Sequence, residues 1–412
     1  MTVFSLITST MLGALVAGGY VAMDPGPSVV VAASPQDSTY GCLICHADKR
    51  RSYRLGVHAE HGIQCHDCHG GDTEAVETAS AHRRGFLGAP DKLQTLTLCS
   101  SCHSDPNQMR QFGLSADQLA EFRTSRHGQL LIERRDFAAP TCTDCHDAHT
   151  ILPPDDARSN VHPMNIPGTC ARCHADRALM ATYGLPTGQL EQYRSGAHGV
   201  GLFEERNFAS PTCVGCHGSH SALPPAVSQI TDVCAKCHVL LNRKLAAGAH
   251  GRPVAEGAIP GCLACHGNHG TEPTPPERIV ALCVRCHGQG SGPMEVAAEI
   301  QERILAAGRE LDEAADAIEE LVAQGYNVDD ERFRHRAAMS DYTQLALVQH
   351  SLDLDELQDL VLKVRSNTGI ILSTAEAHAD EKWEHKLLLV PVWFLALSAM
   401  VLAWFKLREV SR

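Results

Sequence analysis

The chain has 412 residues and a formal net charge of −13, which argues against nucleic-acid binding. Aromatic residues make up only 5% of the sequence, which is few for an ordinary side-chain core in a chain of this length. Eighteen cysteines and 24 histidines are far more than packing requires. We therefore expect a bound group, in addition to side chains, to fill much of the interior.

The first 34 residues have the pattern of an export segment. A hydrophobic stretch from Phe4 to Met23 is followed by Asp24, and a second apolar run ends in small residues at Ala33. This pattern predicts a secretory signal peptide that is cleaved after Ala33. Because no Lys or Arg precedes the stretch, an uncleaved signal anchor is the competing interpretation. A buried core helix fits poorly at the extreme terminus.

All eighteen cysteines fall into nine Cys-x-x-Cys-His motifs. A disulfide framework does not explain why His follows the second Cys every time. Zinc sites need two cysteine pairs per metal, and nine is an odd number. Haem c uses all three residues, because two thiols bind the vinyl groups of one haem and the histidine binds its iron. We therefore predict nine haem c groups.

The motifs assign two sets of residues. The predicted attachment cysteines are Cys42, Cys45, Cys65, Cys68, Cys99, Cys102, Cys142, Cys145, Cys170, Cys173, Cys213, Cys216, Cys234, Cys237, Cys262, Cys265, Cys283 and Cys286. The predicted proximal iron ligands are His46, His69, His103, His146, His174, His217, His238, His266 and His287.

An internal repeat supplies candidates for the second axial ligand. The segment from Arg123 to Pro154 recurs from Arg194 to Pro225, and a shorter copy runs from Ala249 to Gly270. A degenerate first copy, with His58 and the motif Cys65–His69, opens the series. Each unit has one His before its haem motif, which Gly follows in three of four cases. We interpret this Gly as room for the backbone to lie against a flat haem. In three of the units a second His stands three residues after the motif. Two histidines so close in sequence cannot both bind the same iron, so we expect the second to reach a neighbouring haem.

The first unit lacks its second His, because Asp72 stands in that place. His82, or less favourably His61 or His66, is expected to serve there. The ninth ligand is expected from the tail, with His350 preferred over His335. The predicted distal ligands are therefore His58, His82, His127, His149, His198, His220, His250, His269 and His350, whereas His162, His378 and His385 are not expected to bind iron. Two histidines give a six-coordinate iron without an open site.

Residues 293–366 differ from the region before them. They contain no cysteine, and apolar residues from Ala297 to Leu321 recur at alternating three- and four-residue spacings. This heptad stripe predicts a long amphipathic helix that ends near Gly325. We expect a second helix from Asp329 to about Ser366, packed antiparallel on the first. A further helix from Leu372 is expected to lead into the C-terminal apolar run.

Leu387 to Phe405 is an uncharged run, long enough to cross a bilayer as a helix. Lys406, Arg408 and Arg412 follow it, and four acidic residues precede it. The positive-inside rule therefore places the tail in the cytoplasm and the haem-bearing body in the periplasm.

The predicted fold class is mainly α with much irregular structure, organised by stacked haems. Its expected parts are a signal peptide or anchor (1–34), a nine-haem domain (35–290), a helical hairpin (291–372), a juxtamembrane linker (373–386), a transmembrane helix (387–405) and a cytoplasmic tail (406–412).

The alternating motifs, the His-Gly pairs before PTCTDCHDAH and PTCVGCHGSH, and the helical tail resemble the multihaem c-type cytochrome superfamily over roughly residues 40–355. This superfamily includes quinol dehydrogenase cytochromes, nitrite reductases and hydroxylamine oxidoreductases. The resemblance implies bis-histidine haems in stacked pairs and periplasmic electron transfer, often beside a membrane cytochrome b or another quinol-oxidising subunit. Nitrite reductases often carry a Lys variant of the motif, which this chain lacks.

Two classes of function follow. The first is an electron carrier between a membrane donor, linked to quinol, and a periplasmic or outer-surface acceptor such as another cytochrome, as in anaerobic respiration. It has no catalytic residue. The second is an oxidoreductase that acts on a small nitrogen or sulfur species at one five-coordinate haem, and the ligands His82 and His350 are where such a haem would be sought. A polymeric haem wire is disfavoured by the membrane span.

Overall fold

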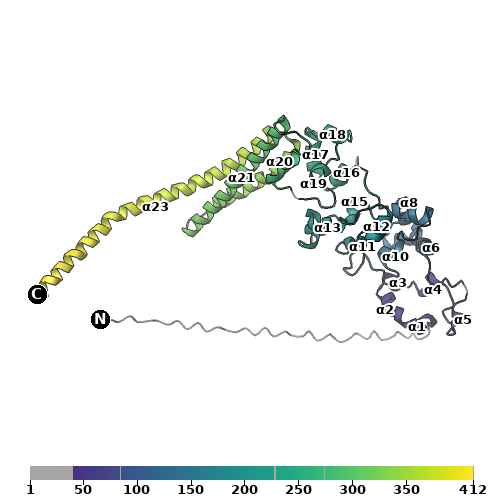
Figure 1. The fold of residues 1–412 in the computed structure, drawn as a ribbon. Coiled ribbons are helices and arrows are strands. Elements are labelled where there is room, and N and C mark those ends of the chain that lie inside the picture. The colour runs from purple at the N-terminus through teal and green to yellow at the C-terminus, as the bar shows by residue number, and fades with distance from the viewer. Residues whose placement is uncertain (1–39, 84, 227–228, 273, 412) are drawn as a thin grey trace. The chain divides into compact units, whose positions relative to one another are not determined.

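The computed structural model describes residues 40–411 except 84, 227–228 and 273, and within the last helix it leaves the side chains of 382, 384–386 and 388 undescribed. Every regular element in this described part is a helix, and none is a strand (Figure 1). The expected mainly α class is therefore confirmed. The predicted export segment, 1–34, lies outside the described residues.

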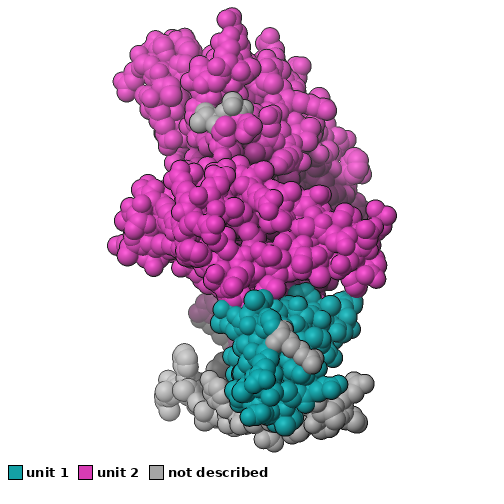
Figure 2. Space-filling view, turned by 90° about the vertical axis from the view of Figure 1, so that its right-hand side faces the viewer, with its two compact units in different colours: residues 1–54, 58–89 teal, residues 55–57, 90–412 magenta. Residues whose placement is uncertain are grey.

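The chain divides into two compact units, Met1–Arg54 with His58–Ala89 and Leu55–Val57 with Pro90–Arg412 (Figure 2). The first two haem motifs lie in the first unit and the other seven in the second. The helices of the first part of the chain are short, namely α1 (Gly41–Cys45), α2 (Ala47–Leu55), α3 (Val57–Glu60), α4 (Cys65–His69) and α5 (Thr78–Ala81).

Short helices and turns also make up the rest of the haem-motif region. They are α6 (Lys92–His103), α7 (Pro106–Met109), η1 (Arg110–Phe112), α8 (Gln118–Thr124), α9 (Arg126–Gly128), η2 (Gln129–Glu133), α10 (Cys142–His146), α11 (Ile166–His174), α12 (Arg177–Thr182), α13 (Gln189–Ser195), α14 (Ala197–Phe203), α15 (Cys213–His217), α16 (Ile230–Ala235), α17 (Val239–Ala247), α18 (Gly251–Ala255), α19 (Leu263–His266), η4 (Pro276–Arg278) and α20 (Ile279–Cys283).

Four of the motifs occupy isolated one-turn helices that end in the same way. The residue directly after the motif histidine has a positive φ, which is 69° at Gly70, 69° at Asp147, 81° at Gly218 and 71° at Gly267. A left-handed residue stops a helix and turns the chain away from its axis. In the last three copies of the sequence repeat, the histidine three residues after the motif therefore follows a sharp turn. This turn separates the histidine from its own motif.

A helical bundle follows the haem motifs. It consists of α21 (Gly292–Ala323), α22 (Asp329–Val348) and the first part of α23 (Leu354–Val410), which lie side by side (Figure 1). The predicted stripe on the first helix is confirmed, since all eight of its apolar residues from Ala297 to Leu321 are buried. They pack against apolar residues of α22 and α23 in two clusters of buried side chains.

The prediction of a second helix from Asp329 to about Ser366 was wrong about its C-terminal end. The structure ends α22 at Val348 and continues through η5 (Gln349–Ser351) to Leu352, whose φ is 58°. Asp353 then caps α23, because its carboxylate accepts hydrogen bonds from the backbone N–H groups of Asp355 and Glu356. The helix expected from Leu372 accordingly starts 18 residues earlier, at Leu354.

The last part of α23 is apolar. By length and composition alone, Leu389–Val410 could cross a membrane as a helix. This segment overlaps the predicted span of 387–405. Pro391 lies inside the helix without ending it. Residues 373–386, expected as a linker, belong to the same continuous helix.

Candidate functional site: paired histidines beside the Cys-x-x-Cys-His motifs

Seven motif histidines each lie opposite a histidine from another part of the chain. Their ring centres are separated by nearly constant distances. The pairs are His46 and His82 (6.3 Å), His146 and His220 (6.1 Å), His174 and His127 (6.0 Å), His217 and His269 (6.0 Å), His238 and His198 (6.1 Å), His266 and His350 (6.2 Å), and His287 and His250 (6.1 Å).

This separation fits one iron between two imidazoles. Two metal–nitrogen bonds of about 2 Å each, together with the distance from each nitrogen to its ring centre, amount to roughly 6 Å. Imidazoles that were merely packed against each other would come closer and vary more. The residues present therefore fit haem c, with the motif cysteines as attachment points and a histidine on each side of the iron.

Hydrogen bonds to backbone carbonyls orient several of these rings. Nδ1 of His69 lies 2.8 Å from the carbonyl oxygen of Gly88, and Nδ1 of His350 lies 2.9 Å from that of Ala346. His217 makes the same contact with Leu223 at 3.2 Å. A carbonyl can only accept, so Nδ1 carries the proton and Nε2 keeps its lone pair. That tautomer directs Nε2 toward a metal.

Burial favours the neutral form of some of these imidazoles. It lowers the pKa of eight histidines of the two predicted ligand sets below the ordinary value, and a neighbouring imidazole lowers it further. They are His103, His127, His146, His174, His198, His250, His269 and His350. Only a neutral imidazole can bind iron, so the surroundings favour the ligating form.

The cysteines of consecutive motifs lie beside one another. First cysteines meet in one set of contacts, where Cys99 donates to Cys142 and holds its pKa to about 7, and Cys234 does the same to Cys262. Cys170 likewise donates to Cys213 and lowers its pKa. In the first compact unit of the fold, Tyr40 lies beside Cys42 and Cys65.

The second cysteines form the other set, in which they are close enough to interact electrostatically. Burial raises the pKa of Cys145, Cys216 and Cys265, and the nearby thiols of Cys173, Cys237 and Cys286, respectively, raise it further. The two kinds of contact alternate from the third motif to the ninth. They make an unbroken succession of neighbouring attachment sites through the second unit.

The glycine that follows three of the distal histidines has a use in addition to the one expected. A Cβ on Gly128 would lie 1.9 Å from the carbonyl oxygen of Phe122, and one on Gly199 would lie 1.9 Å from that of Tyr193. Gly251 meets Ala246 in the same way at 2.0 Å. In each case the partner is the helix before the histidine. The glycine thus allows two short helices to cross closely and fixes where the histidine begins its own helix.

The junction between α17, η5 and α23 positions His350. Lys244 on α17 forms an ion pair with Glu356 in the first turn of α23. A Cβ on Gly248 would lie 2.4 Å from the carbonyl oxygen of Ser351. These contacts hold the end of the bundle against α17, which directly follows the motif of His238. Sequence patterns gave no sign of the carbonyl acceptors or of this junction.

The remaining predicted residues are placed as follows. Axial ligation by His69, His103, His58 and His149 stays a prediction. Of the histidines not preferred as ligands, His66 lies 3.1 Å from the hydroxyl of Tyr40, His162 accepts a hydrogen bond from the backbone of Met164, and His378 stacks on Tyr326. His335 lines a pocket of the bundle.

Two family models match the chain. The model described as cytochrome c3 matches residues 57–175, and the model described as a doubled CXXCH motif matches residues 251–292. Neither the curated proteins nor the solved structures contain a match. The two matched ranges include motifs and histidines of both units.

Proposed function

Because the chain is a multihaem c-type cytochrome, we propose that it carries nine haem c groups and relays electrons between a membrane donor linked to quinol and a periplasmic or outer-surface acceptor. The observation that carries the proposal is the set of seven imidazole pairs at 6.0–6.3 Å. An iron held on both sides has no vacant position for a substrate.

Each part of the chain has a definite task in this function. Haem iron supplies a one-electron couple when it is bound. The motif cysteines hold the group covalently, and two neutral imidazoles occupy its axial positions. Carbonyl acceptors such as those of Gly88 and Ala346 keep the rings turned toward the metal. Rigid ligation favours electron transfer because little has to move.

The succession of neighbouring cysteines supports a continuous route through the second unit. From the motif at Cys99 to that at Cys283, each attachment site is beside the next. Electrons that enter at one end can therefore pass between adjacent groups without leaving the protein. The acidic chain, made more negative by haem propionates, would attract a basic soluble partner.

The apolar end of α23 supports a cytoplasmic-membrane anchor with the haem region in the periplasm. Between Leu354, beside His350, and Leu389, at the start of the apolar segment, α23 is unbroken. At 1.5 Å per residue this is roughly 50 Å of helix. A donor in the membrane must therefore present a redox group well outside the bilayer to serve this end. A cytochrome b complex or another quinol-oxidising complex with a periplasmic subunit meets this requirement.

The competing function is an oxidoreductase with one five-coordinate haem for a small nitrogen or sulfur species. The rings of His82 and His350, the two ligands that were hardest to place, lie opposite His46 and His266. This supports the carrier over the enzyme. Electron paramagnetic resonance of the oxidised protein tests it, with nine low-spin ferric centres expected. A high-spin signal equal to one haem would contradict a pure carrier.

The anchor is tested separately. Deletion of residues 387–412 should release a water-soluble protein that keeps its full haem content, measured as the ratio of haem to protein. Retention of the truncated chain on the membrane would mean that another segment anchors it.

A further inference from the structure

The first half of α22 differs from the rest of the bundle. Its buried apolar residues begin only at Ala338, and the residues from 329 to 337 contribute none to either buried cluster. Its first turn is acidic, with Asp329, Asp330 and Glu331, and three arginines follow directly, at Arg332, Arg334 and Arg336. The chain as a whole has a net charge of −13. Phe333, with 67% of its surface exposed, lies among the arginines. Arginine beside an exposed aromatic is typical of protein interfaces.

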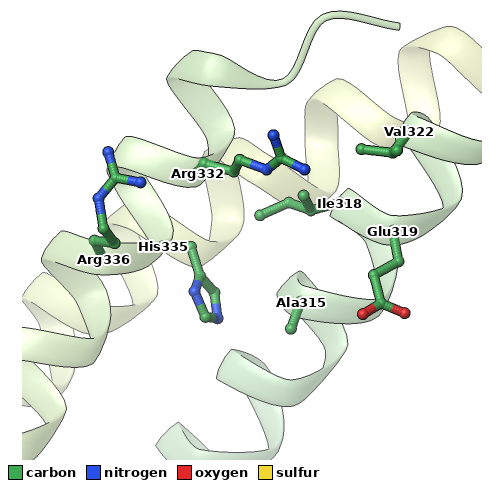
Figure 3. Close-up of a pocket in the computed structure, with 7 residues that line it drawn as sticks. All are labelled: Ala315, Ile318, Glu319, Val322, Arg332, His335 and Arg336. Carbon is green, nitrogen blue, oxygen red and sulfur yellow. The ribbon is translucent and has the colours of Figure 1, made fainter. Parts of the chain in front are cut away.

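A groove lies between this segment and α21. It has a volume of about 350 Å³ and is lined by Ala315, Ile318, Glu319 and Val322 of α21 and by Arg332, His335 and Arg336 of α22 (Figure 3). Ile318 and Ala315 form an apolar floor, and Val322 is 44% exposed at one end. Cationic side chains line the opposite wall.

The polar groups of the groove lack partners of their own. Nε2 of His335 is buried and has no hydrogen-bond partner among the described residues. Neither Arg332 nor Arg336 forms an ion pair with any described carboxylate. A buried polar atom without a partner is costly, whereas the two arginines are exposed and can pair with carboxylates of a ligand.

We propose that this groove docks an acidic amphipathic helix of a partner protein. Apolar side chains of that helix would cover Ala315 and Val322, and its carboxylates would pair with Arg332 and Arg336. A polar group at its centre would satisfy Nε2 of His335. This is recognition of a helix by a groove, with charge complementarity setting the partner.

A second copy of this chain fits less well than a different protein. A two-fold dimer presents the same patch on both sides, and this patch offers only one carboxylate, Glu319, to the Arg332 and Arg336 of the other copy. The proposal goes beyond electron transfer, because it concerns assembly and involves neither the haem ligands nor the cysteines.

The test uses the full haem-loaded protein in detergent and two fluorescent helical peptides. Both peptides carry a leucine stripe, flanked by glutamates in one and by lysines in the other. Fluorescence anisotropy should show that the glutamate peptide binds about tenfold more tightly than the lysine peptide, and that salt weakens this binding. The double variant Arg332→Glu/Arg336→Glu should reverse the preference.

A matched double variant, Arg309→Glu/Lys363→Glu, makes the same change in charge on the bundle outside the groove and should leave the preference unchanged. If the reversal disturbs the fold, seen as lost helicity, Arg332→Gln/Arg336→Gln should still weaken the glutamate peptide about tenfold. Equal binding of the two peptides, or loss in the matched variant, would overturn the proposal. So would full displacement of the peptide by succinate at an equal concentration of carboxylate, because the groove would then bind small anions only.

Discussion

The haem-motif region and the helical bundle are stabilised by different means. Both clusters of buried apolar side chains in the described part of the chain belong to the bundle. In residues 40–290 the fully buried apolar side chains, such as Leu131 and Leu202, belong to neither cluster. The bundle therefore has a core that its own sequence provides. The haem-motif region depends on the groups that its cysteines and histidines hold.

Ligation also replaces packing as the source of long-range order. The paired histidines are far apart in sequence, from His46 with His82 to His266 with His350. Each pair closes a loop of the chain when it binds one iron. Such a closure removes conformational entropy from the unfolded chain, as a disulfide does.

The largest expected effect comes from removing the haems. Replacement of all eighteen cysteines by serine should leave residues 40–290 without stable structure, because side chains alone do not bury enough apolar surface there. The bundle should remain helical. Limited proteolysis with mass spectrometry should show rapid cleavage before residue 290 and a protected fragment that begins near residue 292.

The chain with its cysteines and haems intact is the control for this experiment and should resist cleavage in both regions. Equal protection of both regions in the substituted chain would show that the haem-motif region has a sufficient core of its own.

A substitution in the bundle should have the reverse pattern. Leu345 is fully buried in the cluster with Leu311, Leu357 and Val361. Leu345→Ala should lower the free energy of unfolding of the bundle by about 2–5 kcal/mol, because it removes apolar contacts and leaves a cavity. Thermal unfolding by circular dichroism measures this loss.

The absorption spectrum of the haems should be unchanged by Leu345→Ala at temperatures where the bundle is folded. Leu362→Ala is the matched control, since Leu362 is 52% exposed on the same bundle. A similar loss from both substitutions would contradict the assignment of the core.

Sequence periodicity predicted the bundle well where one face is apolar throughout. It placed all eight buried residues of α21. It missed the break between Val348 and Leu354, because the residues around the break continue to form helices on either side. The local signal was the cap, in which Asp353 is followed three residues later by Glu356.

The sequence predicted those parts of the site that depend on local motifs. Spacing identified the cysteines and the motif histidines, and the repeat supplied candidates for their partners. The repeat did not show which distal histidine pairs with which motif histidine. His127, for example, lies opposite His174, although His146 is nearer to it in sequence. That choice depends on turns such as the one at Asp147 and on close helix crossings, which are properties of the folded chain.

A smaller effect is expected at a close helix crossing. Gly199→Ala places a Cβ 1.9 Å from the carbonyl oxygen of Tyr193, so α13 and α14 must separate and His198 must shift. We expect a loss of about 1–3 kcal/mol in stability. One haem, that of His238, should also show altered axial ligation by electron paramagnetic resonance.

Gly168→Ala is the control for this substitution. Gly168 lies in α11 of the same region, and a Cβ there would meet nothing within 4 Å. It should keep the wild-type spectrum and gain slightly in stability, as Ala does over Gly in a helix. A changed spectrum in Gly168→Ala, or an unchanged one in Gly199→Ala, would contradict the positioning role of Gly199.

The most local effect is expected at the one ligand that the bundle contributes. His350→Ala removes the ring opposite His266 and leaves the motif, the cysteines and both apolar clusters in place. One haem should change from low spin to high spin, visible as a ferric high-spin signal equal to one haem, while haem content and bundle helicity stay constant. His162→Ala, on a histidine that contacts Phe208 and the backbone of Met164, should leave every haem low-spin. An unchanged spectrum in His350→Ala would mean that another group occupies that axial position and that the bundle contributes no ligand to this haem.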